Sequence, residues 1–142
     1  MMGMLSLRIY TDGGARGNPG PAGAGAVLKR LLPDGTEREV LATVSDFLGE
    51  MTNNQAEYEA IIRGLEKARV LGAETVELVM DSELAAKQIR GEYRVKNAAL
   101  AVKFLRVHDL LSGFQRFTVR HIPRERNLEA DALVNRAMDR RF

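Results

Sequence analysis

The sequence predicts an α/β fold: a five-stranded mixed sheet, with three antiparallel meander strands followed by parallel strands, and helices on both faces. Two observations lead to this prediction. Stretches of alternating apolar and polar residues, typical of strands, fill the first third of the chain and are separated by turn residues. Further along, stretches with helical spacing alternate with short β-branched runs, which is typical of parallel strands joined by helical crossovers.

The three meander strands are expected before residue 50. Residues 5–10 alternate between apolar and polar side chains, and this strand is expected to end near Asp12. A loop rich in glycine and proline follows it. Two more strands are expected over 24–32 and 37–48, separated by a short run of turn residues. The first strand would therefore bring Asp12 to its carboxyl end.

Helices and strands alternate in the remaining two thirds of the chain. A Thr-Asn-Asn start signal precedes the first helical stretch, Gly72 ends it, and Ser82 is a good N-cap for the next one. No repeat or long linker interrupts the pattern, so residues 1–142 are expected to form one domain. Helices are expected over 54–70, 82–89, 97–111 and 127–140, and strands over 75–80 and 116–122.

Composition limits the classes of function. The 142 residues are 45% apolar and 28% charged, which are ordinary values for a globular protein. The chain has no cysteine and two histidines, so any metal would be held by oxygen ligands. No stretch approaches the roughly 20 apolar residues of a membrane span. We therefore expect a soluble, cytoplasmic protein without a membrane partner.

Charge alone does not identify a partner. The net charge is only +2, but residues 116–142 contain seven arginines. This segment could face phosphates, or it could be a solvated helix with salt-bridged faces.

Four carboxylates have positions that suit a common site. Asp12 and Asp81 follow predicted strands, and parallel neighbouring strands would place them roughly 5 Å apart. Glu57 and Asp131 each lie about one turn into a helix, beside alanines. Taken singly, each acid has a structural explanation as a turn residue, a cap or a partner of the helix dipole. Together they would repel one another unless a cation joined them, and they would suit Mg²⁺ and phosphodiester cleavage.

Four segments of the chain resemble type 1 ribonuclease H, and the likeness covers nearly the whole sequence. They are YTDGGARGNPGPAGAGA, TNNQAEYEA, MDSELAAKQI and IPRERNLEADALVNRAMD, in this order and at these spacings. Members of that family cut the RNA strand of RNA/DNA hybrids with divalent metal and leave 5′-phosphate and 3′-hydroxyl ends. The resemblance implies a monomeric endonuclease of the ribonuclease H fold that uses two Mg²⁺ ions, with Mn²⁺ as a substitute.

The resemblance also assigns roles to the acids. Asp12 would bridge two metal ions, and Asp131 would complete the site of the ion that activates water. Glu57 and Asp81 would hold the ion that faces the leaving 3′ oxygen. General-base work would then pass to metal-bound water or to a substrate phosphate.

Substrate contacts are implied for the loops around these acids. The glycines after Asp12 would let the chain turn sharply and let a sugar-phosphate backbone approach, although a tight hairpin alone would also explain them. In the family, the side chains that match Asn18 and Thr52 lie near a phosphate of the DNA strand, and those that match Asn53 and Asn54 lie in the minor groove. Thr52 or Asn53 would also serve as a helix cap. The implied substrate-binding residues are Gly13, Gly14, Gly17, Asn18 and Thr52 for the loops and the phosphate, and Asn53 and Asn54 for the minor groove.

The chain departs from the family pattern in three places. The basic, Trp-containing protrusion of many members is reduced to residues 90–96, which predicts weaker, more salt-sensitive binding and admits double-stranded RNA as a second substrate. The product-release histidine aligns with His121, which lies in a predicted strand, so Arg124 in the next loop is the better-placed replacement. Glu83 stands where many members have Gln, which would change a minor-groove contact.

Two other functions stay open at this stage. A non-catalytic hybrid-binding module would keep the fold without the chemistry, although it would have no reason to keep four acids. A structure-specific nuclease, such as a resolvase or transposase, could share the same fold. Cleavage of an RNA/DNA hybrid compared with a DNA four-way junction would separate these alternatives.

Overall fold

A single five-stranded mixed sheet forms the centre of the molecule, as the sequence predicts. The computed structural model describes residues 4–140. Strand order is β3-β2-β1-β4-β5; the first three strands along the chain pair antiparallel, and β4 pairs parallel with both β1 and β5. The strands are β1 (Ser6–Ala15), β2 (Gly20–Leu31), β3 (Glu37–Met51), β4 (Thr75–Met80) and β5 (Arg116–His121).

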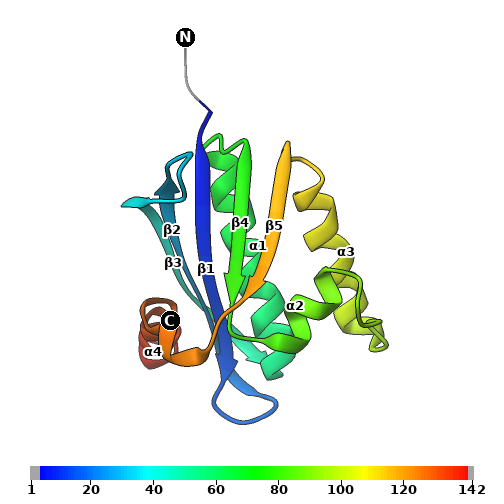
Figure 1. Cartoon of the computed structure of the whole chain (residues 1–142). Coiled ribbons are helices and arrows are strands. Elements are labelled where there is room, and N and C mark those ends of the chain that lie inside the picture. The colour runs from blue at the N-terminus through cyan, green and yellow to red at the C-terminus, as the bar shows by residue number, and fades with distance from the viewer. Residues whose placement is uncertain (1–3, 141–142) are drawn as a thin grey trace.

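Helices cover both faces of this sheet, which confirms the predicted fold class. Helices α1, α2 and α3 pack on one face, and α4 packs on the other face over β2 and β3 (Figure 1). None of the helices in residues 4–140 is both long and apolar enough to cross a membrane. The helices are α1 (Asn53–Val70), α2 (Glu83–Ile89), α3 (Ala98–Leu111) and α4 (Leu128–Arg140), with a short 3₁₀ helix, η1 (Arg124–Arg126), before α4.

The main core lies between the sheet and α1. Leu7 and Ile9 on β1, Leu78 on β4 and Leu65 on α1 are fully buried, so the strand alternation read from the sequence points apolar side chains to this face. On the other face α4 approaches the backbone of β2 closely. A Cβ at Gly25 would lie 2.4 Å from the carbonyl oxygen of Ala130, so only glycine fits there.

The first hairpin differs from the prediction. β1 does not end near Asp12 but continues to Ala15, and β2 begins at Gly20 rather than at residue 24. The prediction was wrong because it read the glycines as turn residues, whereas Gly13 pairs with Ala24 within the antiparallel ladder. Asp12 still lies one residue past Thr11, where the parallel pairing with β4 stops.

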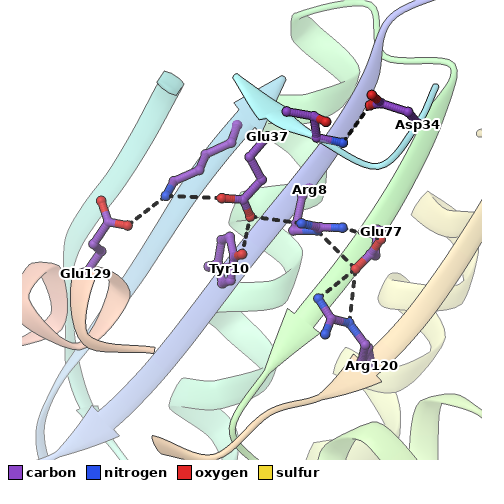
Figure 2. Close-up of polar contacts among 9 residues, drawn as sticks. Arg8, Tyr10, Asp34, Glu37, Glu77, Arg120 and Glu129 are labelled. Carbon is purple, nitrogen blue, oxygen red and sulfur yellow. Dashed lines mark hydrogen bonds and ion pairs between the residues drawn. The ribbon is translucent and has the colours of Figure 1, made fainter. Parts of the chain in front are cut away.

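Polar side chains form a continuous network on the sheet face that α4 leaves open (Figure 2). The Arg8 guanidinium donates to both carboxylate oxygens of Glu77, at 3.0 and 3.2 Å, and to Glu37 at 3.1 Å. Arg120 donates to Glu77 as well, at 3.0 Å, and shares the oxygen Oε1 with Arg8. Tyr10 donates to Glu37 as well. Glu37 and Glu77 therefore each have at least two hydrogen-bond donors.

Candidate active site

Three carboxylates meet at the carboxyl end of the two central strands. Asp12, Glu57 and Asp81 each place a carboxylate oxygen within 4.8 Å of the others, and all three side chains are partly buried. They are 24 to 69 residues apart in the chain. The fold therefore brings together three of the four acids that the sequence singled out.

Strand register and one glycine produce this meeting. Thr11 pairs with Met80 at the last parallel step between β1 and β4, so Asp12 and Asp81 follow at the same level of the sheet. A Cβ at Gly13 would lie 2.1 Å from the carbonyl oxygen of Ala56 and 2.6 Å from the amide nitrogen of Glu57. Because Gly13 has no Cβ, the first turn of α1 can rest on β1 and deliver Glu57 to Asp12.

The fourth acid, Asp131, reaches the site from the opposite face. It lies in the first turn of α4, and its side chain shares a hydrogen bond with that of Asp12. Ala130, its neighbour, is fully buried against β2 beside Gly25, which brings this turn close to the sheet. Asp131 is not one of the three acids whose oxygens all lie within 4.8 Å of one another. It borders their cluster on the Asp12 side.

Burial and the neighbouring acids together raise the pKa of Asp12 strongly. Burial is the largest cause, and the charge of Asp81, the hydrogen bond with Asp131 and the charge of Glu57 add to it, giving a pKa of about 8. The neighbouring groups that act most strongly on this carboxyl, Asp81, Asp131 and Glu57, are themselves acids. Without a cation, Asp12 would therefore hold a proton at neutral pH.

The pKa of Glu57 is raised less than that of Asp12, because Ser82 and Arg124 act to lower it. Burial is again the largest cause; the Ser82 hydroxyl donates a hydrogen bond that acts in the opposite direction, Asp81 raises the pKa further, and the charge of Arg124 lowers it, leaving a pKa of about 7. Ser82 also accepts a hydrogen bond from Ala85 at 3.1 Å and so caps α2. One hydroxyl thus starts the helix after Asp81 and contacts a second acid of the site.

The donor set fits a hard divalent cation. The group consists of carboxylate oxygens, which Mg²⁺ and Mn²⁺ prefer, and it opens to solvent, so water and substrate phosphate can complete the coordination. A bound cation would also remove the repulsion that raises the pKa of Asp12. The metal sites expected at Asp12, Glu57, Asp81 and Asp131 are therefore compatible with this geometry.

The glycines of the first hairpin have different structural roles. Of Gly13, Gly14, Gly17 and Gly20, only Gly17 has a positive φ, of 104°, at the tip of the hairpin. Gly13 serves the contact with α1, while a Cβ at Gly14 would have its nearest neighbour 3.9 Å away. The space beside Gly14 is thus open, whereas the space beside Gly13 is filled by protein. Substrate contacts at Gly13, Gly14 and Gly17 stay predictions.

Amide side chains link the hairpin to α1. The Asn18 side-chain oxygen accepts from the backbone N–H of Asn53 at 3.0 Å, and the Asn53 side-chain oxygen accepts from the backbone N–H of Ala15 at 2.9 Å. Thr52 is the N-cap of α1 and forms a capping box with Gln55. The predicted helix-cap role of Thr52 is therefore confirmed, and its contact with DNA stays a prediction.

A polar cavity of about 260 Å³ lies beside these amides. It is lined by the side of the hairpin, the start of α1 and the start of α3, where Asn97 is the N-cap. Asn97 was not among the predicted site residues, although an Asn at the start of a helical stretch is a local signal for a cap. The lining residues are Asn18, Thr52, Asn54, Gln55, Asn97 and Leu100.

The remaining candidates lie at different distances from the acids. Arg124 opens η1, is exposed, and acts electrostatically on Glu57. His121 lies within β5, as the sequence predicts, and is exposed; the strand ends there, one residue before its predicted end. Glu83 is the first residue of α2 and pairs with Lys87 at 3.3 Å. Arg124 is the one with a direct effect on an acid of the site, and the functional roles of all three stay predictions.

Asn127 was overlooked by sequence analysis. It is 1% exposed, and its side-chain nitrogen donates to Asp81 at 2.9 Å and to the Thr11 carbonyl oxygen at 2.8 Å. In the sequence it stands in PRERN, where the neighbouring charges suggest an exposed loop. Its burial results from tertiary packing, and no periodic pattern in the neighbouring sequence predicts it.

The five-stranded sheet of this order, with acids at the ends of its central strands, defines the class of protein: an α/β protein of the ribonuclease H fold. The family described as reverse transcriptase-like matches residues 10–137. Ribonuclease HI of Halobacterium salinarum is 44% identical over 133 residues, which cover 94% of this chain and 64% of that protein. Ribonuclease H of Anaplasma marginale is 35% identical over 156 residues, covering 100% of this chain and 96% of that protein.

A solved structure shows the same fold with a nucleic acid. The crystal structure of LC11-RNase H1 in complex with an RNA/DNA hybrid has 44% sequence identity and a TM-score of 0.85, and the match covers 95% of this chain and 98% of that one. The chain belongs to the type 1 ribonuclease H family. It spans 64% of the length of the Halobacterium relative and 36% of three mycobacterial proteins that it also matches.

Proposed function

We propose that this chain is an endonuclease that hydrolyses the RNA strand of RNA/DNA hybrids, with divalent metal ions held by Asp12, Glu57, Asp81 and Asp131. The observation that carries this proposal is the meeting of acids from β1, α1 and the end of β4, where the groups that act most strongly on Asp12 are themselves acids. The relative whose crystal structure contains an RNA/DNA hybrid supports the choice of substrate.

The carboxylates would hold the metal, and the rest of the site would position the nucleic acid. When bound, two Mg²⁺ or Mn²⁺ ions would stabilise the attacking and departing oxygens of the phosphodiester and yield 5′-phosphate and 3′-hydroxyl ends. Asp12 is central because it contacts Asp131 on one side and faces Glu57 and Asp81 on the other. Its proton would leave when the metal binds.

Substrate recognition would use the polar surface beside the acids. Asn18 and Asn53 use their side-chain oxygens for contacts within the protein, so their amide nitrogens are the atoms available for a ligand. Amide donors of this kind suit 2′-hydroxyls and base edges, and the 2′-hydroxyl distinguishes RNA from DNA. The cavity lined by Asn18, Thr52 and Asn97 would hold a backbone phosphate through neutral donors.

The test is cleavage of labelled substrates by the wild type and by two charge-neutralising variants. Asp12→Asn should lower the rate on an RNA/DNA hybrid by about a thousandfold or more, because it removes a ligand shared by the whole acid cluster. Glu77→Gln is the matched control: it neutralises a carboxylate of the same sheet that pairs with Arg8 and Arg120 and not with the acids. It should cut the hybrid at the wild-type rate.

Substrate and metal controls separate the alternatives. The wild type should cut the hybrid with Mg²⁺ or Mn²⁺ and not with chelator, should cut double-stranded RNA more slowly, and should leave a DNA duplex and a DNA four-way junction intact. Hybrid binding without turnover in either metal would show a binding module instead. Preference for the junction would show a structure-specific nuclease.

A further inference from the structure

We infer that Asn127 is a positioning residue, which fixes the Asp81 carboxylate and the start of α4 so that the acids can share metal. This inference rests on the proposed function and adds a residue that touches neither metal nor substrate in it. Asn127 lies between η1 and α4, in the segment that crosses the carboxyl ends of β4 and β1 (Figure 1). It is the position at which this segment enters the interior.

The hydrogen bonds of Asn127 reach three of the four acids or their neighbours. Its side-chain nitrogen donates one proton to the carboxylate of Asp81, at 2.9 Å, and the other to the carbonyl oxygen of Thr11, the residue before Asp12, at 2.8 Å. Its backbone carbonyl accepts from the amide of Asp131 at 3.1 Å. One residue therefore ties β1, β4 and α4 together at the level of the acids.

The chemistry of these partners suits the side-chain amide nitrogen of asparagine. A carboxylate and a backbone carbonyl are both acceptors, so only a group with at least two N–H donors can bond to both. An aspartate in this place would have no donor and would repel Asp81. In metal sites, partners of this kind fix the orientation of the ligands, and their loss typically costs about 10- to 100-fold in metal affinity.

A simple capping role does not explain this residue. Asn is a common N-cap because its side-chain oxygen accepts from the amides of the first helical turn. Here the side-chain oxygen of Asn127 is buried and has no hydrogen-bond partner within residues 4–140. The side chain is thus turned toward Asp81 and Thr11, at the expense of the cap.

The test measures metal binding without nucleic acid, so it does not depend on turnover. In calorimetric titrations with Mn²⁺, Asn127→Ala should bind about 10- to 100-fold more weakly than the wild type. Gln88→Met is the matched control, because Gln88 is also a buried amide, accepts from the Tyr58 hydroxyl at 2.7 Å, and, within residues 4–140, forms no hydrogen bond with the four acids. It should lower the melting temperature and leave the Mn²⁺ dissociation constant unchanged.

The outcomes distinguish the inference from the proposed function. Wild-type cleavage and Mn²⁺ binding, combined with unchanged Mn²⁺ binding by a folded Asn127→Ala variant, would overturn the positioning role alone. A wild type that neither binds Mn²⁺ nor cuts hybrid would overturn the proposed function and this inference with it.

A second measurement decides the matter if Asn127→Ala does not fold. In the wild type, both side-chain amide protons of Asn127 should exchange with solvent much more slowly than those of exposed Asn54, because both are hydrogen-bonded and buried. Exchange as fast as at Asn54 would overturn the inference.

Discussion

The acids at the carboxyl end of the sheet and the acids on its open face have opposite surroundings. Glu37 and Glu77 on the open face are bonded by Arg8, Tyr10 and Arg120 (Figure 2). Although burial acts to raise the pKa of Glu37, the hydrogen bonds from Tyr10 and Arg8 and the charge of Lys29 lower it overall. Asp12, on the same strand as Arg8 and Tyr10, has a pKa raised to about 8.

This difference shows which acids stabilise the fold and which destabilise it. A carboxylate with cationic partners contributes to stability, whereas buried acids that face one another cost free energy until a cation arrives. The chain compensates charge on the open face and leaves it uncompensated at Asp12. Such unrelieved repulsion is typical of functional sites.

The largest effect is expected from Gly13→Ala, which disturbs the acidic end without changing its charge. The added Cβ would overlap the carbonyl group of Ala56, with 2.1 Å to its oxygen, so α1 must shift and carry Glu57 away. We expect a loss of about 3 kcal/mol or more in unfolding free energy, measured by denaturant titration. Gly14→Ala is the control, because its nearest neighbour would be 3.9 Å away. Equal stability of the two variants would contradict the role given to Gly13.

Asp12→Asn should stabilise the metal-free protein. At pH 8 in chelator we expect a gain of about 3 kcal/mol, roughly half the full linkage energy, because the site remains in contact with water. Thermal and denaturant unfolding would measure it. A variant less stable than the wild type would show that Asp12 has a stabilising partner that this structure does not contain.

Stability in chelator should fall as the pH rises from about 5 to 8. The pKa values of Asp12 and Glu57 are raised to about 8 and about 7, above their unfolded values near 4, so the unfolded chain loses its protons first. The two raised pKa values therefore stabilise the folded protein fully when the pH is below the unfolded pKa values, and this stabilisation is lost as the pH rises through the folded pKa values. We expect a fall of about 3 kcal/mol, with the same halving of the linkage energy, and saturating Mg²⁺ should largely remove it. A flat profile in chelator would contradict the raised pKa values.

The smallest change in unfolding free energy is expected for Glu77→Gln on the open face, and its sign is opposite to that of Asp12→Asn. Glu77→Gln removes the charge that pairs with Arg8 and Arg120, and it should lower the unfolding free energy by about 1–2 kcal/mol. The same unfolding titrations would measure it beside Asp12→Asn. If both substitutions shifted stability in the same direction, the contrast between the two regions would not hold.

The periodic elements could be predicted from the sequence, and the tertiary contacts could not. Strand β4 was predicted with its observed ends, and α1 within one residue, because alternation and cap residues are local signals. The end of β1 was misplaced because glycine is typical of turns and also of strands that another backbone approaches, as at Gly13. Spacing alone does not separate these two uses.

The candidate site shows the same division. The acids could be found from their positions after strands and within first helical turns, together with the family resemblance. Asn127 could not, because its value depends on Asp81 and Thr11, which lie 46 and 116 residues away in the chain. The contact between Ser82 and Glu57 is likewise tertiary, so Ser82 was read only as a helix cap.

Anomalous scattering from Mn²⁺, in crystals of the protein with an RNA/DNA hybrid, tests the central claim most directly. We predict Mn²⁺ bound by the oxygens of Asp12, Glu57 and Asp81, with a phosphate of the RNA strand beside it. A hybrid bound elsewhere on the molecule, or acids that bind no Mn²⁺ with the hybrid present, would contradict this prediction.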